Sequence, residues 1–191
     1  MNLPNKLTIV RLVLIPLFVA VYFISSIPYN YVISAVIFLL ASFTDFLDGY
    51  IARKYNLVTD LGKFLDPIAD KVLVSTALIV LLTPATGELA ILPEYSAIAV
   101  ALILARELIV SGFRMVAASN GSVLAADWSG KVKTFVTDVA IVILLVGADV
   151  QPGLYSVVNI IGLVLFGIAT LLTVYSGAEC IIKNRKVLKT K

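Results

Sequence analysis

The chain has 191 residues, of which 60% are hydrophobic and 14% are charged, and its formal net charge at pH 7 is +3. A soluble domain of this length could not bury so much apolar surface. The composition therefore favours one integral-membrane domain over residues 1–191, surrounded by membrane lipids and without a nucleic-acid partner. The absence of histidine and the presence of a single cysteine exclude histidine-ligated metal, Ser-His or Cys-His catalysis and an internal disulfide.

Six apolar segments follow one another along the chain, each close to or above the ~20 residues that cross a bilayer. They cover residues 7–27, 31–54, 61–83, 94–118, 131–149 and 153–182. No small-residue cleavage site follows the first segment, so we expect a retained span and not a signal peptide. The pattern predicts an all-α membrane bundle of six transmembrane helices. It contains no Gly-x-x-x-Gly motif, so it does not indicate which helices pack together.

Basic residues are concentrated at alternate ends of these segments. The turns at 26–30, 84–93 and 149–153 contain neither Lys nor Arg, whereas the other ends carry Lys54, Lys63, Lys131 and the basic tail 183–191, among others. By the positive-inside rule, both termini then face the cytoplasm. We therefore predict a multi-pass protein of the cell (plasma) membrane.

The second and third segments contain four carboxylates, although each costs ~2.5–3.5 kcal/mol at the centre of a spanning helix. Asp45 and Asp48 stand three residues apart, and Asp66 and Asp70 stand four apart, so each pair shares one helix face. At ~1.5 Å of rise per residue, Asp45 and Asp70 each lie about 13 Å from the cytoplasmic end of their segment. If the two segments are antiparallel neighbours, both pairs reach the same depth.

These carboxylates predict a divalent-metal site. Oxygen ligands without sulfur or imidazole suit Mg²⁺ or Mn²⁺, and two such ions can clamp the attacking and leaving oxygens of a displacement at phosphorus. Beside them are three small residues that leave room for a bulky ligand and a cation placed to pair with a phosphate: Gly49, Ala52, Gly62 and Arg53. The alternative is a structural network in which Lys63, Lys71 and Arg53 neutralise the carboxylates, which is expensive inside a bilayer.

The pattern Asp45-x-x-Asp48-Gly49-x-x-Ala52-Arg53-x8-Gly62-x3-Asp66-x3-Asp70 resembles the signature of the CDP-alcohol phosphotransferases at every fixed position. The resemblance is strong in the first half of the chain and looser in the second. It implies a six-span, usually dimeric membrane enzyme that moves a phosphatidyl group from a CDP-linked lipid to an alcohol and releases CMP. It also implies metal ligands at Asp45, Asp48, Asp66 and Asp70, with Asp70 acting as general base. The implied binding site for cytidine diphosphate comprises Asp48, Gly49, Ala52, Arg53 and Gly62.

The opening segment adds three polar residues, Asn5, Thr8 and Arg11, which recur at i, i+3 and i+6. One interpretation is that they reach the nucleotide from the first span. In the alternative interpretation, Asn5 caps the first helix and Arg11 extends to the membrane interface.

The residues expected to bind the acceptor alcohol lie in the second half of the chain, from about residue 106 to 134. Arg106 and Arg114 are about 80° apart around a helix, so both can face one cavity, and Lys131 and Lys133 begin the fifth segment. A buried basic pocket predicts an acceptor that carries a phosphate, since an uncharged alcohol would leave these cations unmatched. Alternatively, Arg106 pairs with Glu107 or Asp138, and the two lysines extend to the interface.

Together with the opening segment, these residues make the chain most similar to bacterial members of the family that use CDP-diacylglycerol and glycerol 3-phosphate. We therefore expect a phosphatidyl transfer in phospholipid biosynthesis, catalysed by a homodimer whose active site faces the cytoplasm. The main alternative is an enzyme of the same family with inositol phosphate, serine or phosphatidylglycerol as acceptor. A divalent-cation transporter and a non-catalytic lipid-binding subunit are the alternatives from other classes.

Overall fold

The computed structural model describes residues 3–55, 60–84, 90–119, 128–150 and 156–183. Within these ranges, the side chains of residues 3, 4, 46, 52, 53, 60–64, 66, 67, 118 and 119 lie outside the description.

The described residues form six helices: α1 (Leu3–Phe23), α2 (Asn30–Lys54), α3 (Asp60–Leu81), α4 (Ser96–Ser119), α5 (Trp128–Val150) and α6 (Val157–Lys183). Each helix overlaps one of the six apolar segments, with ends that differ by up to four residues. The described ranges contain no strand, so the prediction of an all-α fold is confirmed. Helices α1, α2, α4 and α6 have the length and hydropathy needed to cross a membrane. The chain is thus a multi-pass membrane protein.

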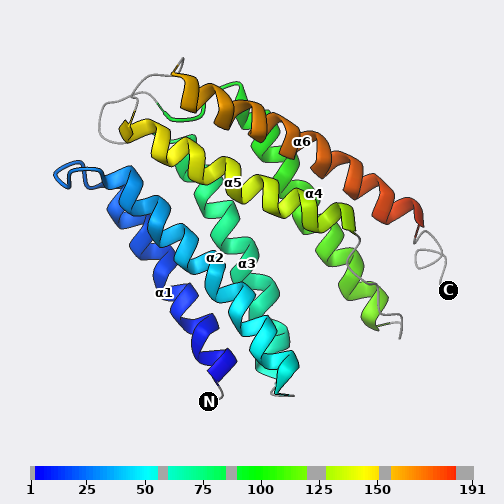
Figure 1. Ribbon diagram of the computed structural model, residues 1–191. Helices are drawn as coiled ribbons and strands as arrows, with labels where there is room; N and C mark the ends of the chain where they lie inside the picture. Colours follow the sequence, from blue (N-terminus) through cyan, green and yellow to red (C-terminus); the bar gives the residue numbers. More distant parts are fainter. Residues whose placement is uncertain (1–2, 56–59, 85–89, 120–127, 151–155, 184–191) are drawn as a thin grey trace.

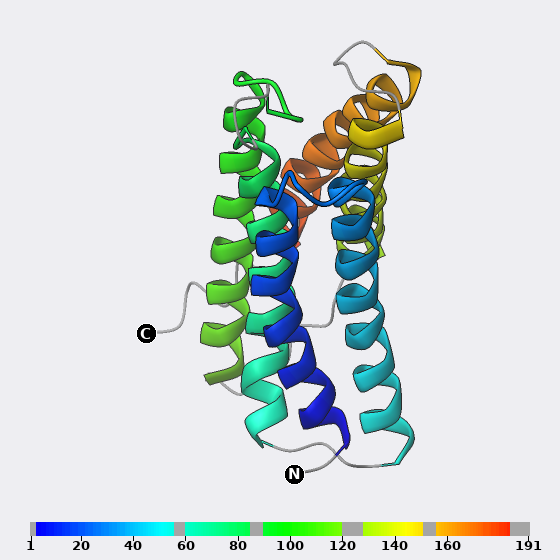
Figure 2. The ribbon, with the colours of Figure 1, turned by 90° about the vertical axis from the view of Figure 1, so that its left-hand side faces the viewer.

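The helices form one long bundle. In the view of Figure 1, α1, α2 and α3 lie towards the lower left, and α4, α5 and α6 lie towards the upper right. Helix α1 makes extensive contacts with α2 and α3, and α5 makes its most extensive contact with α6 and a further one with α2. Helices α2 and α3 touch each other, but both contact α1 more widely, and Figure 2 shows α1 running beside them. The first helix is therefore a structural partner of both segments that carry the carboxylates.

Polar contacts close the ends of α1 and α2 where these two helices meet. Tyr29 adopts a left-handed conformation with a φ of 58°, which breaks the helical path between them. The side chain of Asn30 donates a hydrogen bond of 2.8 Å to the Tyr22 carbonyl at the end of α1. Asp149 of α5 accepts a hydrogen bond of 2.7 Å from the Val32 backbone N–H in the first turn of α2. These contacts satisfy backbone groups that a helix end leaves unpaired.

Small residues allow the closest helix contacts. A Cβ atom at Gly162 of α6 would lie 2.8 Å from Leu144 of α5, and one at Gly147 would lie 2.2 Å from the Asn159 side chain. Since lipid provides no hydrophobic drive for helices to associate, such close backbone approach is a main source of packing energy in a membrane. One apolar core cluster runs through all six helices and includes Phe18, Phe38, Leu78, Ile103, Leu144 and Phe166.

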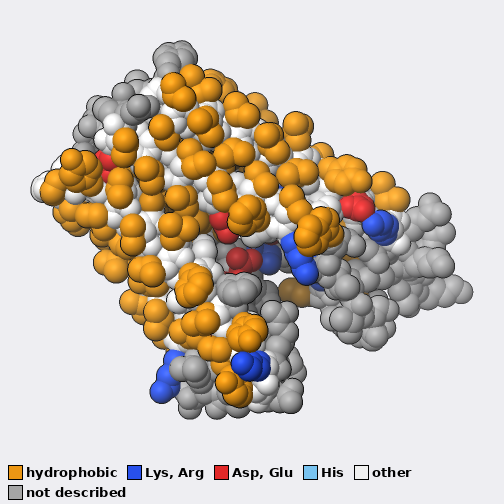
Figure 3. All heavy atoms as spheres, viewed as in Figure 1, with side chains coloured by type: hydrophobic (Ala, Val, Ile, Leu, Met, Phe, Trp, Pro, Cys, Tyr) orange, Lys and Arg blue, Asp and Glu red, His pale blue; other side chains and the backbone are white. Residues whose placement is uncertain are grey.

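The outer surface is apolar over most of its extent. Large hydrophobic side chains such as Ile98, Leu108 and Leu171 are about seven-tenths exposed, as expected of side chains that face lipid. Figure 3 shows hydrophobic side chains covering most of one face, with a small group of acidic and basic side chains in a recess near its middle. The single cysteine, Cys180, is buried against Val110 and Phe113.

Candidate functional site

A buried arginine joins two of the carboxylates. Arg11 of α1 has no exposed side-chain surface, and its Nη2 donates a hydrogen bond of 2.5 Å to Asp48 Oδ2. Its Nη1 lies 2.8 Å from Asp45 Oδ1. The side chain of Asp48 is 3% exposed, whereas that of Asp45 is 42% exposed, so one carboxylate is enclosed and the other opens towards solvent or a ligand. Asp45 and Asp48 therefore converge on a single positive charge.

This convergence bears on the predicted metal site. Two carboxylates that share one face of α2 already hold a cationic group between them, and their oxygens are the ligand type that Mg²⁺ and Mn²⁺ prefer. The residues present thus fit a divalent cation in their chemistry. Among the side chains that the structure describes, no three acidic groups lie close enough together to hold a metal, and the side chain of Asp66 is outside that set.

Asp70 of α3 faces the same polar interior. Its carboxyl group interacts electrostatically with Asp45, Lys71, Glu107 and Arg11, which come from four different helices. Asp70 also borders a small cavity of about 20 Å³, whose lining includes Lys71, Glu107, Lys133, Thr134 and Thr137. Asp45 of α2 and Asp70 of α3 are therefore within electrostatic range of each other, and Asp70 lies on the side nearer to α4 and α5.

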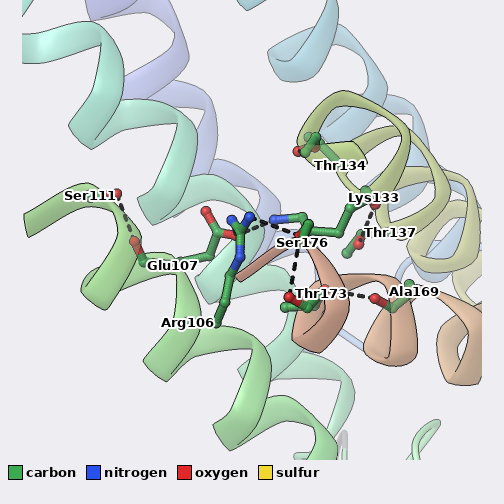
Figure 4. Close-up of polar contacts among 10 residues, drawn as sticks. Arg106, Glu107, Ser111, Lys133, Thr134, Thr137, Ala169, Thr173 and Ser176 are labelled. Atoms are coloured by element: carbon green, nitrogen blue, oxygen red, sulfur yellow. Dashed lines mark hydrogen bonds and ion pairs between the residues drawn. The ribbon is translucent and has the colours of Figure 1, made fainter. Parts of the chain in front are cut away.

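A second charged cluster lies where α4, α5 and α6 meet (Figure 4). Its Glu107 and Lys133 line the same cavity as Asp70. Arg106 Nη1 donates a hydrogen bond of 3.0 Å to Glu107 Oε1, and Lys133 Nζ contacts the same oxygen. Arg106 Nη2 donates a second hydrogen bond, 2.8 Å long, to Ser176 Oγ. The alternative prediction that Arg106 pairs with Glu107 is confirmed. The assignment of Arg106 and Lys133 to the phosphate of the acceptor stays a prediction.

Sequence reasoning did not identify the contribution of α6 to this cluster. Gly177 lies directly against Arg106, because a Cβ atom there would be 2.9 Å from Arg106 Cγ. Ser176 fixes the end of the guanidinium, and both residues are buried. The only sequence signal for them is a pair of small residues inside a strongly apolar span.

The remaining basic residues of the predicted acceptor region differ in their surroundings. Arg114 is half-buried, and its Nε is enclosed without a hydrogen-bond partner among the described residues. Lys131 is exposed in the first turns of α5, whereas Lys133 is buried, so the interpretation that Lys133 extends to the interface is wrong. Asp138 interacts electrostatically with Asp70 and Lys133, and its Oδ1 is buried without a hydrogen-bond partner in the described part of the chain.

Asn5, Thr8 and Arg11 of α1 all face inward. Asn5 and Thr8 are buried together with Arg11, one turn apart on the same face. The alternative interpretation of this segment is wrong on both counts. Asn5 lies inside a helix that begins at Leu3 and cannot be its N-cap, and Arg11 is enclosed and does not extend to the interface.

The other predicted nucleotide and metal residues lie in the C-terminal part of α2 and the N-terminal part of α3. Gly49 is half-buried on α2. Ala52 and Arg53 on α2, and Gly62 and Asp66 on α3, have side chains outside the described set, so their parts in the site remain predictions.

Comparison with known proteins shows which family and which relatives this chain is similar to. The family model described as CDP-alcohol phosphatidyltransferase matches residues 1–175. A CDP-diacylglycerol–glycerol-3-phosphate 3-phosphatidyltransferase of Bacillus subtilis (strain 168) is 41% identical over 200 residues, covering 99% of this chain and 98% of that protein. Proteins of the same name from Rickettsia bellii (strain RML369-C) and Salmonella typhimurium (strain LT2) are 42% and 38% identical, over 92% of this chain and 91% and 90% of their own.

Proposed function

This chain belongs to the CDP-alcohol phosphatidyltransferase family, and from that premise we propose that it transfers the phosphatidyl group of CDP-diacylglycerol to glycerol 3-phosphate, giving phosphatidylglycerophosphate and CMP. The single observation that carries the choice of acceptor is the basic cluster of half-buried Arg106 and buried Lys133, because Lys133 lines the same cavity as Asp70. The near full-length similarity to relatives named for this reaction supports the same choice. The site would then serve phospholipid biosynthesis.

The metal and nucleotide parts of the proposal rest on the residues of α1, α2 and α3. Asp45, Asp48, Asp66 and Asp70 would hold the Mg²⁺ or Mn²⁺ ions, which when bound neutralise charge on the diphosphate. Asn5, Thr8, Arg11 and Asp48, with Gly49, Ala52, Arg53 and Gly62, would hold the cytidine diphosphate. The polar side chains of Asn5, Thr8 and Arg11 support this assignment, because all three are buried and Arg11 contacts Asp48.

Asp70 performs the proton transfer in this proposal. Its carboxylate accepts the proton of a glycerol hydroxyl, whose oxygen forms a bond to the lipid-linked phosphorus. The bond from that phosphorus to the CMP oxygen breaks, and CMP leaves with the electron pair. Arg106, Arg114, Lys131 and Lys133 bind the phosphate of the acceptor and hold its hydroxyl towards Asp70. The enclosed Nε of Arg114 supports a role in anion binding, since a buried donor without a partner is costly.

The membrane arrangement extends the four spans already identified. Helices α3 and α5 have 22 and 23 residues, about 33 Å at 1.5 Å per residue, which is long enough to cross the ~30 Å core of a bilayer. We propose that all six helices span, with both termini and the active site on the cytoplasmic side, and that two copies form a homodimer. The charged residues that lower the hydropathy of α3 and α5 include four that are assigned to the site: Asp66, Asp70, Lys131 and Lys133.

The test is a panel of acceptors with the purified protein in detergent. With CDP-diacylglycerol and Mg²⁺ or Mn²⁺, we expect CMP release with glycerol 3-phosphate and little with serine, inositol phosphate or phosphatidylglycerol. Chelation of the metal should abolish the release, and added Mg²⁺ or Mn²⁺ should restore it. A preference for another acceptor would assign the chain to a sister activity. Metal uptake into sealed vesicles without CMP release would favour the transporter.

Replacing Arg114 by Ala is expected to raise the glycerol 3-phosphate concentration needed for half-maximal rate by roughly 10- to 100-fold. A hydrogen bond between charged groups contributes about 1.5–3 kcal/mol, which corresponds to that range. The requirement for CDP-diacylglycerol should change much less. The control is Lys183→Ala, which removes an exposed cation at the end of α6. An unchanged glycerol 3-phosphate requirement in Arg114→Ala would remove this residue from the acceptor site.

A further inference from the structure

Glu107 occupies the position in the basic cluster that an acceptor's phosphate would need. One carboxylate oxygen, Oε1, contacts both Arg106 and Lys133, which come from different helices (Figure 4). Lys71 of α3 also interacts with Glu107 electrostatically. A single carboxylate thus lies among three cations from α3, α4 and α5.

The cavity beside this cluster is too small for the proposed acceptor. Its volume of about 20 Å³ is enough for about one water molecule, and Glu107 and Lys133 both line it. Asp70 lines the same cavity, so a hydroxyl directed at Asp70 has to share this space with the phosphate-binding cations. For an acceptor to enter, the contact between Glu107 and Lys133 has to open.

We propose that Glu107 is an internal counter-anion for Arg106 and Lys133. It pairs with both cations until an acceptor binds, and the phosphate of the acceptor then displaces it from them. This inference rests on the proposed function, because it concerns the same acceptor site. Before an acceptor binds, the carboxylate offsets the cost of burying Lys133 and half-burying Arg106. A phosphate monoester carries a charge of about −1.5 to −2 and three terminal oxygens, so it competes well against a carboxylate of charge −1.

The consequence is selectivity for the acceptor. An uncharged alcohol has no group that can replace the carboxylate on Arg106 and Lys133, so the closed arrangement excludes it. Glu107 is thereby a specificity-determining residue: it weakens the binding of every acceptor, and it weakens those without a phosphate most. Arg106 stays in place during the exchange because Ser176 and Gly177 of α6 hold its other side.

The experiment compares wild type with Glu107→Gln, which removes the charge and keeps the shape of the side chain. We measure the binding of inorganic phosphate to the detergent-solubilised protein by calorimetry, and the dependence of CMP release on glycerol 3-phosphate and on glycerol. In the variant we expect phosphate to bind on the order of tenfold more tightly, because the competing anion is gone. The half-saturating glycerol 3-phosphate concentration should fall, and the rate ratio of glycerol 3-phosphate to glycerol should also fall.

The matched control is Glu179→Gln. Glu179 of α6 also pairs with a lysine, Lys183, at 2.5 Å and accepts a hydrogen bond of 2.7 Å from Ser129, but it lies outside the cluster. Its replacement should leave phosphate binding and selectivity unchanged. If Glu107→Gln does not fold, Glu107→Asp provides the test, since the shorter carboxylate should bind Lys133 less well and shift phosphate binding in the same direction.

Weaker or unchanged phosphate binding in a folded Glu107 variant would overturn the inference and make Glu107 a positioning partner of Lys133. The absence of phosphate binding to both wild type and variant would overturn it as well. Failure of the proposed function has a different signature: wild type would release CMP with serine or phosphatidylglycerol in preference to glycerol 3-phosphate. Phosphate binding needs no lipid donor, so the two failures are distinguishable.

Discussion

Replacing Asp70 by Asn is expected to lower the rate of CMP release by a factor of about 10²–10⁴, the usual contribution of a general base. The amide cannot accept the proton of the attacking hydroxyl, while its shape and its place beside the cavity are retained. Much of the nucleotide affinity should remain, because Asp45, Asp48 and the polar residues of α1 are unchanged. The measurement is the rate of CMP release at saturating substrates, together with direct binding of a CDP nucleotide.

The control for this prediction is Asp149→Asn at the opposite end of the bundle. Asp149 caps the start of α2 through the Val32 N–H, so its replacement removes a carboxylate from the bundle without touching the site. This variant should lose some thermal stability and keep its rate per folded molecule. If Asp70→Asn lost nucleotide affinity and turnover in equal measure, Asp70 would be chiefly structural.

Replacing Arg11 by Met is expected to lower the free energy of unfolding by about 3–5 kcal/mol, the usual effect of removing one partner from a buried ion pair. Methionine fills a similar volume but leaves Asp48, which is 3% exposed, as a buried charge beside Asp45 without the guanidinium that joins them. The measurement is thermal or denaturant unfolding in detergent. We expect Mg²⁺ or Mn²⁺ to restore part of the loss, because a bound cation can replace the missing positive charge.

Lys6→Met is the matched control for Arg11→Met. Lys6 is an exposed cation on the same helix, so its replacement should change stability little and create no new response to divalent ions. Equal stabilities of wild type and Arg11→Met would show that Arg11 contributes nothing to holding the two carboxylates together. A loss of stability that neither Mg²⁺ nor Mn²⁺ reduces would separate the structural role of Arg11 from the proposed metal site.

Hydropathy predicts the helices of this chain well because a segment surrounded by lipid has few stable backbone conformations other than a helix. A spanning segment has to satisfy all of its backbone hydrogen bonds internally, so a long apolar run becomes a helix. The boundaries are less predictable. The first apolar segment extends to residue 27, but α1 ends at Phe23, where the Asn30 side chain binds the Tyr22 carbonyl and Tyr29 turns the chain. These contacts depend on individual side chains that follow the helix. A hydropathy average over a window of residues does not detect them.

Depth along the helices predicts part of the site. Helical rise places Asp45 and Asp70 at about 13 Å from one membrane surface, and the structure brings them within electrostatic range. The same arithmetic places Arg11, eight residues after Leu3, at about 12 Å. That agreement could have suggested Arg11 as a partner of Asp45 and Asp48. Depth alone does not distinguish Arg11 from other candidate partners, since Lys71 and Arg53 are also close in sequence to the carboxylates.

The amino-acid sequence by itself determined that lipid surrounds this protein, where its helices lie, and that Asp45 and Asp70 come within range of each other, because hydropathy and helical spacing are local properties. Only the tertiary structure decided which charges meet: Arg11 with Asp45 and Asp48, and Glu107 with both Arg106 and Lys133. Those pairings depend on the rotation of each helix about its axis. That rotation is set by contacts such as Gly162 with Leu144 and Gly177 with Arg106, which join residues far apart in the chain.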